Sequence, residues 1–322
     1  ALGIAALHEC GGPHTSDEDD FTMLLALARS GGRLPAVYGY WGELNAVAKA
    51  RELGAIGAGG DLFADGALGS HTAHLRRPYA DAPDTTGVGY VTEPQVAEHV
   101  IACVREGVQA GFHAIGDRAL ATVLGGFAAA ARDIGRDRVR AGRHRIEHAE
   151  LLDRSMIAAM VKYGLVASVQ PAFDRLWGGA GRMYASRLGA ERARVANPLA
   201  ALAGVGVPLA FGSDAPVTPL DPWGTVVAAT RHHNPGQRLG PRAAFAAHTR
   251  GGWRATGRDG EGALLPGRRA TFAVWRAPGG VFDGLPRLVA QDPDEPAPPR
   301  PVCVRTVSRG VVIFDADAPV SG

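Results

Sequence analysis

Two histidines and an aspartate stand where apolar segments of the sequence end. His113 closes the run VQAGFH, His148 closes RHRIEH, and Asp214 follows PLAFGS. If these runs are parallel strands of one barrel, their carboxyl ends meet at one face, so the two imidazoles and the carboxylate converge. Three N/O donors are typical of catalytic zinc, which keeps one position for water. We therefore expect a hydrolytic metal site, with Asp214 as a ligand or as the acid/base group.

Each of these residues also has a simpler interpretation. A single histidine at a strand end is more often a hydrogen-bonded structural residue, and Gly-Ser-Asp is also typical of a turn and a helix N-cap. The functional interpretation depends on three such groups at the ends of strands in one predicted barrel.

Seven short apolar segments alternate with helical patterns, and these must position the three residues. Alternating strands and helices predict a parallel sheet with helical crossovers. Because polar residues end most strands, a TIM-type (β/α)8 barrel with one strand missing fits better than an open doubly wound sheet, for which the GxGxxG loop is missing. The expected strands lie within 2–9, 33–41, 55–66, 108–116, 143–150, 164–171 and 208–217, and helices within 17–30, 93–107, 117–135 and 154–164, with Asp117 as a helix N-cap.

The composition limits the function classes. The chain has 322 residues, of which 46% are hydrophobic, enough for a large core. Its 34 basic and 32 acidic residues give a net charge of +2, which offers no electrostatic basis for binding nucleic acid or an anionic membrane. No apolar run reaches the roughly 18 residues of a membrane span and no signal peptide pattern is present, so we expect a cytoplasmic protein. Three widely spaced cysteines speak against a disulfide framework.

The sequence changes character after residue 257. Short strand-like stretches such as TFAVW and VVIF follow it. We expect two domains, a barrel over 1–257 and a small β-sandwich portion over 258–322.

Five motifs occur in a fixed order along the chain: FADGALGSHTA, GFHAIGDRAL, HRIEHAE, SVQPAFD and FGSDAPVTPLDP. Together with an early HEC and a late GALLPG, they resemble the YtcJ-like branch of the amidohydrolase superfamily over nearly the whole chain. The resemblance implies a metal-dependent hydrolase on a distorted TIM barrel, with a β-sandwich built from both termini. It also implies that His113 and His148 bind metal, that Asp214 is a ligand and acid/base group, and that Gln170 lines the substrate pocket.

Two features depart from that family pattern. The HxH pair of the family's first barrel strand is missing, so we expect that strand and the N-terminal half of the sandwich to be absent. Many members also carry a carbamylated lysine on the fourth strand, where this chain has Asp61. Asp61 is either a direct carboxylate ligand or a polar residue without a metal.

Residues near the predicted rim are candidates for substrate binding. Trp41 ends a strand and would form an apolar pocket wall, although a packing role is an equal alternative. Asp65, Ser70 and His71 lie in the long loop after the fourth strand, where loops often bind substrate, although a turn also explains Asp65.

Three further polar residues have expected structural roles. Glu147 should point to the opposite side of its strand from His148, against a helix or toward the ligands. His232 and His233 are expected late in a helix, where the helix dipole favours them.

The predicted function is hydrolysis of an amide or N-acyl C–N bond in a small molecule, by metal-activated water. Zinc is the default ion, and iron or manganese suit the same donors. The alternative is an incomplete barrel that binds a small molecule or pairs with another chain through two open sheet edges, which makes a homo-oligomer possible. A phosphate-binding barrel is a weaker option, because no glycine-rich anion loop follows the late strands.

Overall fold

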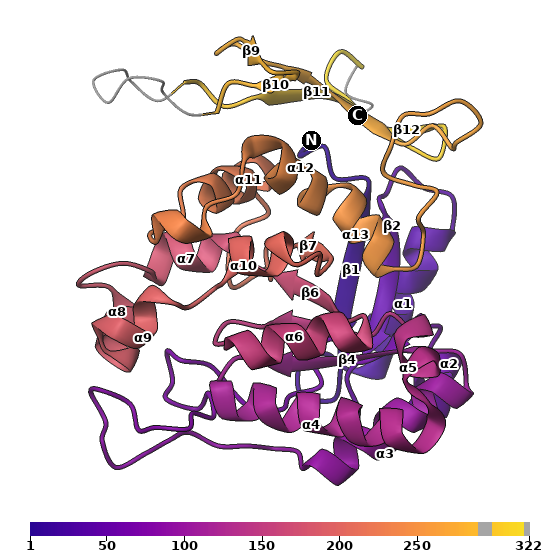
Figure 1. The fold of residues 1–322 in the computed structure, drawn as a ribbon. Coiled ribbons are helices and arrows are strands. Elements are labelled where there is room, and N and C mark those ends of the chain that lie inside the picture. The colour runs from indigo at the N-terminus through magenta and orange to yellow at the C-terminus, as the bar shows by residue number, and fades with distance from the viewer. Residues whose placement is uncertain (289–297, 319–322) are drawn as a thin grey trace.

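A curled parallel sheet of seven strands forms the centre of the protein in the computed structural model, which describes residues 1–288 and 298–318 (Figure 1). The strands lie side by side in sequence order and every neighbouring pair is parallel, as connections through helices require. This confirms the predicted fold class, a TIM-type α/β barrel portion followed by antiparallel strands. The strands are β1 (Ala6–Gly11), β2 (Ala36–Trp41), β3 (Gly57–Ala58), β4 (Gln109–Ala114), β5 (Arg145–His148), β6 (Val166–Val169) and β7 (Leu209–Phe211).

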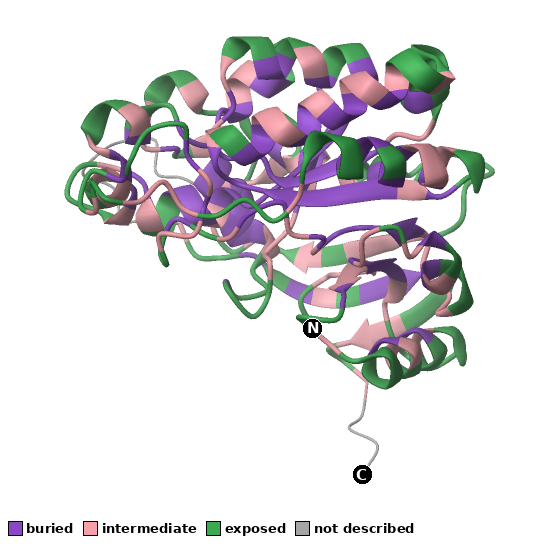
Figure 2. Ribbon diagram, turned by 90° about the horizontal axis from the view of Figure 1, so that it is seen from below, coloured by how far each residue is buried: buried purple, intermediate pink, exposed green. Residues whose placement is uncertain are grey.

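Helices cover the outer face of the sheet, and Figure 2 shows that the strands are buried beneath them. Within the described ranges, none of the helices is long and apolar enough to cross a bilayer. The helices are α1 (Glu18–Arg29), α2 (Val47–Glu52), α3 (Glu93–Arg105), α4 (Asp117–Ile134), α5 (Arg136–Ala141), α6 (Arg154–Tyr163), α7 (Pro171–Trp177), α8 (Met183–Leu188), α9 (Ala190–Arg194), α10 (Leu199–Gly204), α11 (Pro222–Thr230), the 3-10 helix η1 (Pro235–Gln237), α12 (Pro241–His248) and α13 (Arg250–Ala255).

Side-chain caps explain where several helices begin. Asp17 accepts a hydrogen bond from the Asp20 N–H at the start of α1, and Thr92 and Gln95 form a capping box on α3. The prediction that Asp117 caps α4 is wrong. Gly116 occupies the cap position, and the Asp117 carboxylate instead accepts the backbone N–H of Arg76 at 2.8 Å.

The third strand is much shorter than the predicted segment 55–66. Gly59 has a φ of 152°, and a Cβ built there would lie 2.3 Å from the backbone nitrogen of Gly111. The chain therefore leaves the sheet after Ala58 and returns only at Phe63, through an isolated bridge to His113. This bend carries Asp61 over the carboxyl end of the sheet.

A polar network fills the inner side of the sheet. Arg145 donates hydrogen bonds to both carboxylate oxygens of Glu147, at 2.5 and 2.8 Å, and to Ser168 Oγ at 2.8 Å. Its guanidinium also lies 4.3 Å from the ring centre of Tyr40. The pair is buried, and its hydrogen bonds compensate for lost hydration. Glu147 therefore faces the barrel interior. Of its two expected roles, packing against a helix is wrong, and a contact toward the ligands stays a prediction.

Antiparallel strands follow the barrel and lie beside the N-terminal segment (Figure 1). The Ser308 hydroxyl donates to the Ala5 carbonyl at 3.3 Å, and the Trp275 ring lies 5.4 Å from that of Trp223. The predicted division at residue 257 stays a prediction, and residues 289–297 and 319–322 of the second predicted domain lie outside the described residues. These strands are β8 (Phe272–Arg276), β9 (Val281–Phe282), β10 (Leu285–Pro286), β11 (Val302–Ser308) and β12 (Val311–Asp315).

Candidate metal centre

Asp61, His113 and His148 come together at the carboxyl end of the sheet. Each offers one donor atom, and the three atoms lie within 4.8 Å of one another. His113 reaches this point as the penultimate residue of β4, with its side chain toward the barrel interior. His148 would point away by strand alternation, but its φ of 69° breaks the pattern, and the two imidazole centres lie 4.4 Å apart. Two strand ends and one loop therefore build the cluster.

The hydrogen bonds of the two histidines determine which ring nitrogen is free. His113 Nε2 lies 3.1 Å from the Gly66 carbonyl oxygen, and His148 Nδ1 lies 2.9 Å from Gln170 Oε1. Because both oxygens can only accept, each of these nitrogens must carry the proton. The lone pairs are then on His113 Nδ1 and His148 Nε2. A metal-binding histidine characteristically donates its other N–H to an oxygen in this way.

The three donor atoms are otherwise uncommitted. Within the described residues, no hydrogen bond is made by His113 Nδ1, His148 Nε2 or the Asp61 carboxylate. None of these atoms is among the buried polar atoms that are inaccessible to solvent and lack a hydrogen-bond partner. They are therefore open to a ligand from the solvent side. This combination of convergence, free lone pairs and access fits a divalent cation with open coordination positions.

The local electrostatics also favour a cation. Burial, together with the negative charges of Asp214, Glu147 and Glu9, raises the pKa of Asp61 to about 7 against the lowering effect of Arg145. Burial, followed by the charge on His148, holds the pKa of His113 well below its ordinary value, so this ring is neutral. A bound cation would offset the mutual repulsion of the carboxylates.

The same test excludes other buried histidines as ligands through Nε2. His99, His144 and His232 each accept a backbone N–H on Nδ1, at 3.0, 2.8 and 3.0 Å, so the proton of the neutral ring is on Nε2. His232 belongs to a second group with Asp174 and His233 whose donor atoms also lie within 4.8 Å. There both rings lie against one Asp174 oxygen, at 3.2 and 2.5 Å. This group is a structural contact, and the prediction that the two histidines lie late in a helix is wrong because α11 ends at Thr230.

Asp214 lies beside this cluster without joining it. It follows β7 in a loop, has a φ of 55°, and does not belong to the trio of donor atoms within 4.8 Å. Its charge nevertheless raises the pKa of Asp61, which shows that the two carboxylates are close. Its role as a ligand or acid/base group stays a prediction.

Comparison with known proteins identifies the family. A model described as the amidohydrolase family matches residues 1–314. The chain belongs to the amidohydrolase family. Among its relatives, YtcJ of Bacillus subtilis strain 168 is 35% identical over 185 residues, which cover 56% of this chain and 32% of YtcJ. The protein LONG AFTER FAR-RED 3 of Arabidopsis thaliana is 33% identical over 222 residues, which cover 66% of this chain and 37% of that protein.

The solved structures agree with this assignment. A protein described as an uncharacterized metal-dependent hydrolase from Pyrococcus furiosus superposes with a TM-score of 0.68 and 28% identity, over 84% of this chain and 55% of that chain. This amidohydrolase-family chain therefore spans about a third of the two sequence relatives and about half of the structural one.

Two of the predicted substrate-binding residues lie away from open space in this family member. Trp41 is 1% exposed, packs 5.2 Å from the Phe21 ring of α1, and donates to Glu43 at 2.8 Å, which fits the packing alternative. Asp65 is fully buried, and its oxygens accept three backbone N–H groups, those of His74, Ile115 and Gly116, at 2.7–3.0 Å. Both geometries favour structural roles, and substrate binding by either residue stays a prediction.

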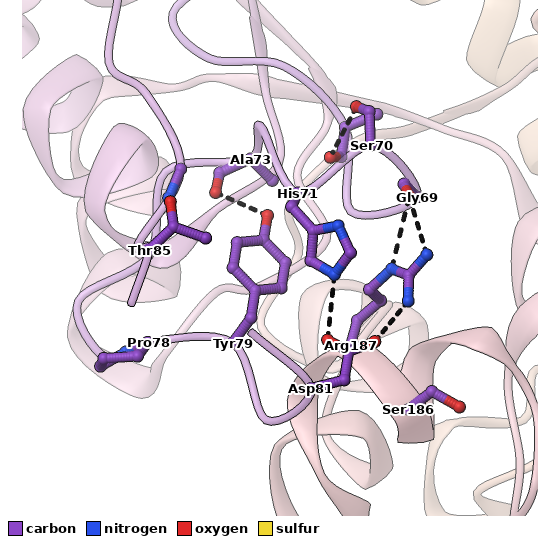
Figure 3. A network of polar contacts seen from close by, with 12 residues as sticks. Gly69, Ser70, His71, Ala73, Pro78, Tyr79, Asp81, Thr85, Ser186 and Arg187 are labelled. Atoms are coloured by element: carbon purple, nitrogen blue, oxygen red, sulfur yellow. Dashed lines mark hydrogen bonds and ion pairs between the residues drawn. The ribbon is translucent and has the colours of Figure 1, made fainter. Parts of the chain in front are cut away.

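Ser70 and His71 lie in a tightly bonded loop, shown in Figure 3. The Ser70 hydroxyl lies 2.7 Å from that of Thr72, and His71 Nε2 lies 3.0 Å from the Asp81 carboxylate. Arg187 of α8 pairs with Asp81 and donates to the Gly69 carbonyl at 3.0 Å (Figure 3). The loop is therefore fastened to α8, and a substrate contact by Ser70 or His71 stays a prediction.

The sequence analysis missed three groups around the cluster. The Gly66 carbonyl fixes His113, the Phe63 ring lies 4.8 Å from the His113 ring, and Phe173 stacks on His148 at 5.8 Å and 11°. All three residues lie in the quoted motifs FADGALG and SVQPAFD, which was the only signal for them.

Proposed function

We propose that this chain carries the metal site of a hydrolase that cleaves an amide or N-acyl C–N bond. The observation that supports it is the convergence of Asp61, His113 and His148, each of which offers one donor atom within 4.8 Å of the others. The hydrogen bonds of the two rings leave His113 Nδ1 and His148 Nε2 as the free nitrogens. The hydrogen bonds to Gly66 and Gln170 prepare both imidazoles for this role before any ion binds.

The residues around the cluster have different roles in the proposed hydrolysis. A divalent cation at this site supplies Lewis acidity that polarises a carbonyl and makes water a better nucleophile. The Asp214 carboxylate, which makes no side-chain hydrogen bond within the described residues, takes the proton of the attacking water and returns it to the leaving nitrogen. The partly exposed Phe63 provides apolar ring surface beside His113 and orients the apolar part of the substrate, and the buried Phe173 holds the His148 ring by stacking on it.

We further propose zinc as the resident ion, with iron or manganese as the chemically similar options. The partner is a small amide-type molecule rather than nucleic acid or a membrane, because the net charge is only +2. A cytoplasmic location and a homo-oligomer remain part of the same proposal.

Metal content of the purified, dialysed chain tests the proposal. We expect about one equivalent of zinc, iron or manganese per chain, and less than about a tenth in the H113N/H148N variant. H14N is the matched control, because His14 is exposed, and it should keep the full equivalent. A wild-type chain that is folded but binds less than about a tenth of an equivalent would refute the metal site. A panel of N-acyl amino acids and anilides then tests the bond cleaved.

One observation favours the alternative of an incomplete barrel that binds without catalysis. Within the described structure, the edge strands β1 and β7 each pair with a single neighbour. Under that alternative the chain binds the ion but hydrolyses none of the amides. Full metal occupancy without turnover would therefore favour it over the hydrolase.

A further inference from the structure

Residues of α6 and α10, the helices labelled in Figure 1, line a groove on the surface of the protein. Its volume is about 1050 Å³, and none of the three cluster residues lines it. Leu152 and Ile157 are buried residues of its lining, and Val161, Val195 and Val205 are lining residues that are 40%, 51% and 53% exposed. Branched apolar side chains that remain this exposed along a concave surface are typical of a binding site.

Four arginines line the same groove, against two aspartates. Asp153 is neutralised by its pair with Arg76 at 2.9 Å and caps α6, whereas Asp117 accepts the Arg76 backbone N–H and keeps its negative charge. Arg77 and Arg154, by contrast, are exposed and make no side-chain hydrogen bond or ion pair within the described residues. Arg77 and Arg154 therefore give the groove an excess of positive charge beside its apolar surface, with Asp117 as the acidic lining residue that no arginine pairs with in the described structure.

A smaller cavity, which Glu191 also lines, adjoins the groove at Arg77 and Arg192. It has a volume of about 350 Å³ and shares Arg77 and Arg192 with the groove. Arg192 is held in place by hydrogen bonds to the Arg77 and Pro78 carbonyls at 3.1 and 2.7 Å. Burial, and then the charge on Arg77, lower the pKa of Arg192 against the raising effects of Asp117 and Tyr79. An anion at this end of the groove would relieve the repulsion between the two arginines.

We propose that this groove binds a soluble anionic amphiphile, such as a medium-chain carboxylate, with its head group on Arg77 and Arg154 and its apolar body along Ile157 and Val195. The arginines bind the anionic head group of such a ligand, and the apolar side chains of the groove bind its hydrocarbon part. A concave groove encloses a single chain, whereas binding to a bilayer requires a protruding apolar surface. The site is separate from the hydrolytic centre and does not depend on a metal.

A matched pair of fluorescent probes tests both halves of the proposal. ANS carries a sulfonate on an aromatic body, and N-phenyl-1-naphthylamine has the same body without the charge. We expect ANS to bind one site on the metal-free chain, to be displaced by decanoate, and to bind more weakly as salt is added. The R77Q/R154Q variant should weaken ANS by at least about fivefold and leave the uncharged probe within about twofold.

Two controls make the outcome decisive. R105Q/R138Q removes two exposed arginines elsewhere and should leave ANS binding unchanged. V195D, at a half-exposed position, should weaken both probes without unfolding the chain. Equal ANS affinity of R77Q/R154Q and the wild type, or equal wild-type affinity for both probes, would overturn the proposal. A third result would also overturn the proposal: ANS does not bind the wild-type chain, the chain self-associates, and V195D abolishes that self-association. The groove would then be the contact surface for a second copy of the chain.

Discussion

Replacing Gln170 by methionine tests the geometry of the candidate site most directly. Gln170 is 7% exposed, and its Oε1 is the acceptor for His148 Nδ1–H at 2.9 Å. Methionine fills the same space without an acceptor, so the imidazole N–H becomes an unpaired buried donor, which costs about 1–3 kcal/mol. Since 1.4 kcal/mol corresponds to a factor of ten, we expect metal affinity to fall about tenfold to hundredfold. The stacking of Phe173 on His148 keeps the ring in place and limits the loss.

The assay is a competition titration of the metal-free chain with zinc and a chelator of known affinity. Q170E is the matched control, because a carboxylate still accepts from His148 Nδ1–H and should hold the affinity near that of the wild type. Near-ultraviolet circular dichroism of each variant verifies folding. If Q170M bound zinc within about twofold of the wild type, the assignment of Nε2 as the donor atom of His148 would fail.

Four further outcomes follow from the same coordinates. Because the pKa of Asp61 is raised to about 7, zinc must displace a proton from this carboxyl group below that pH. The zinc affinity should therefore rise about tenfold per pH unit from pH 5.5 to 7 and then level off. An affinity that does not change with pH in the chelator titration contradicts this. The raised pKa of Asp61 also means that the folded, metal-free chain binds more protons than the unfolded chain between about pH 4 and 7, so the stability of the fold decreases as pH rises through that window. D61N should therefore raise the melting temperature at pH 8 while weakening zinc binding. An unchanged melting temperature refutes the electrostatic account. D65A removes the acceptor of three backbone N–H groups and should lower the free energy of unfolding, measured in urea, by about 3 kcal/mol or more. A loss below about 1 kcal/mol would show that Asp65 does not stabilise its loop. R187Q should change the free energy of unfolding by less than about 1 kcal/mol, because the ion pair of Arg187 with Asp81 is partly exposed. The same variant should increase the rate of amide hydrogen exchange in residues 66–90. Exchange at the wild-type rate contradicts the role of Arg187 in holding this loop.

The sequence predicted the order of the elements well because the signals for them are local. Apolar runs ending in polar residues located all seven barrel strands, and helical periodicity located α1, α3, α4 and α6 within a few residues. The third strand was predicted too long because the apolar pattern of 55–66 does not show that Gly59 must approach Gly111 closely.

Within the site, the sequence predicted the residue types and missed how their side chains are held. Strand alternation alone turns His148 away from His113, and only the positive φ at His148 brings the rings together. The partners that fix the protonated nitrogens, Gly66 and Gln170, are 47 and 22 residues away in sequence, so no local pattern reports them. Glu147 was misplaced because His148 was taken as the inward residue of β5, whereas Glu147 lies opposite His113 in the register and pairs inside with Arg145.

In the part of the chain that the structure describes, the edge strands β1 and β7 each have one side without a paired strand. A further strand at that position could add ligands to this site. A strand that entered between β1 and β7 would run parallel to both, and the alternation of inward and outward side chains would fix its register. Residues spaced by two on that strand would reach the carboxyl face together and add a pair of ligands to those of β4 and β5. Such a strand supplied as a separate peptide would turn the chain into a split protein, whose metal affinity reports fragment complementation.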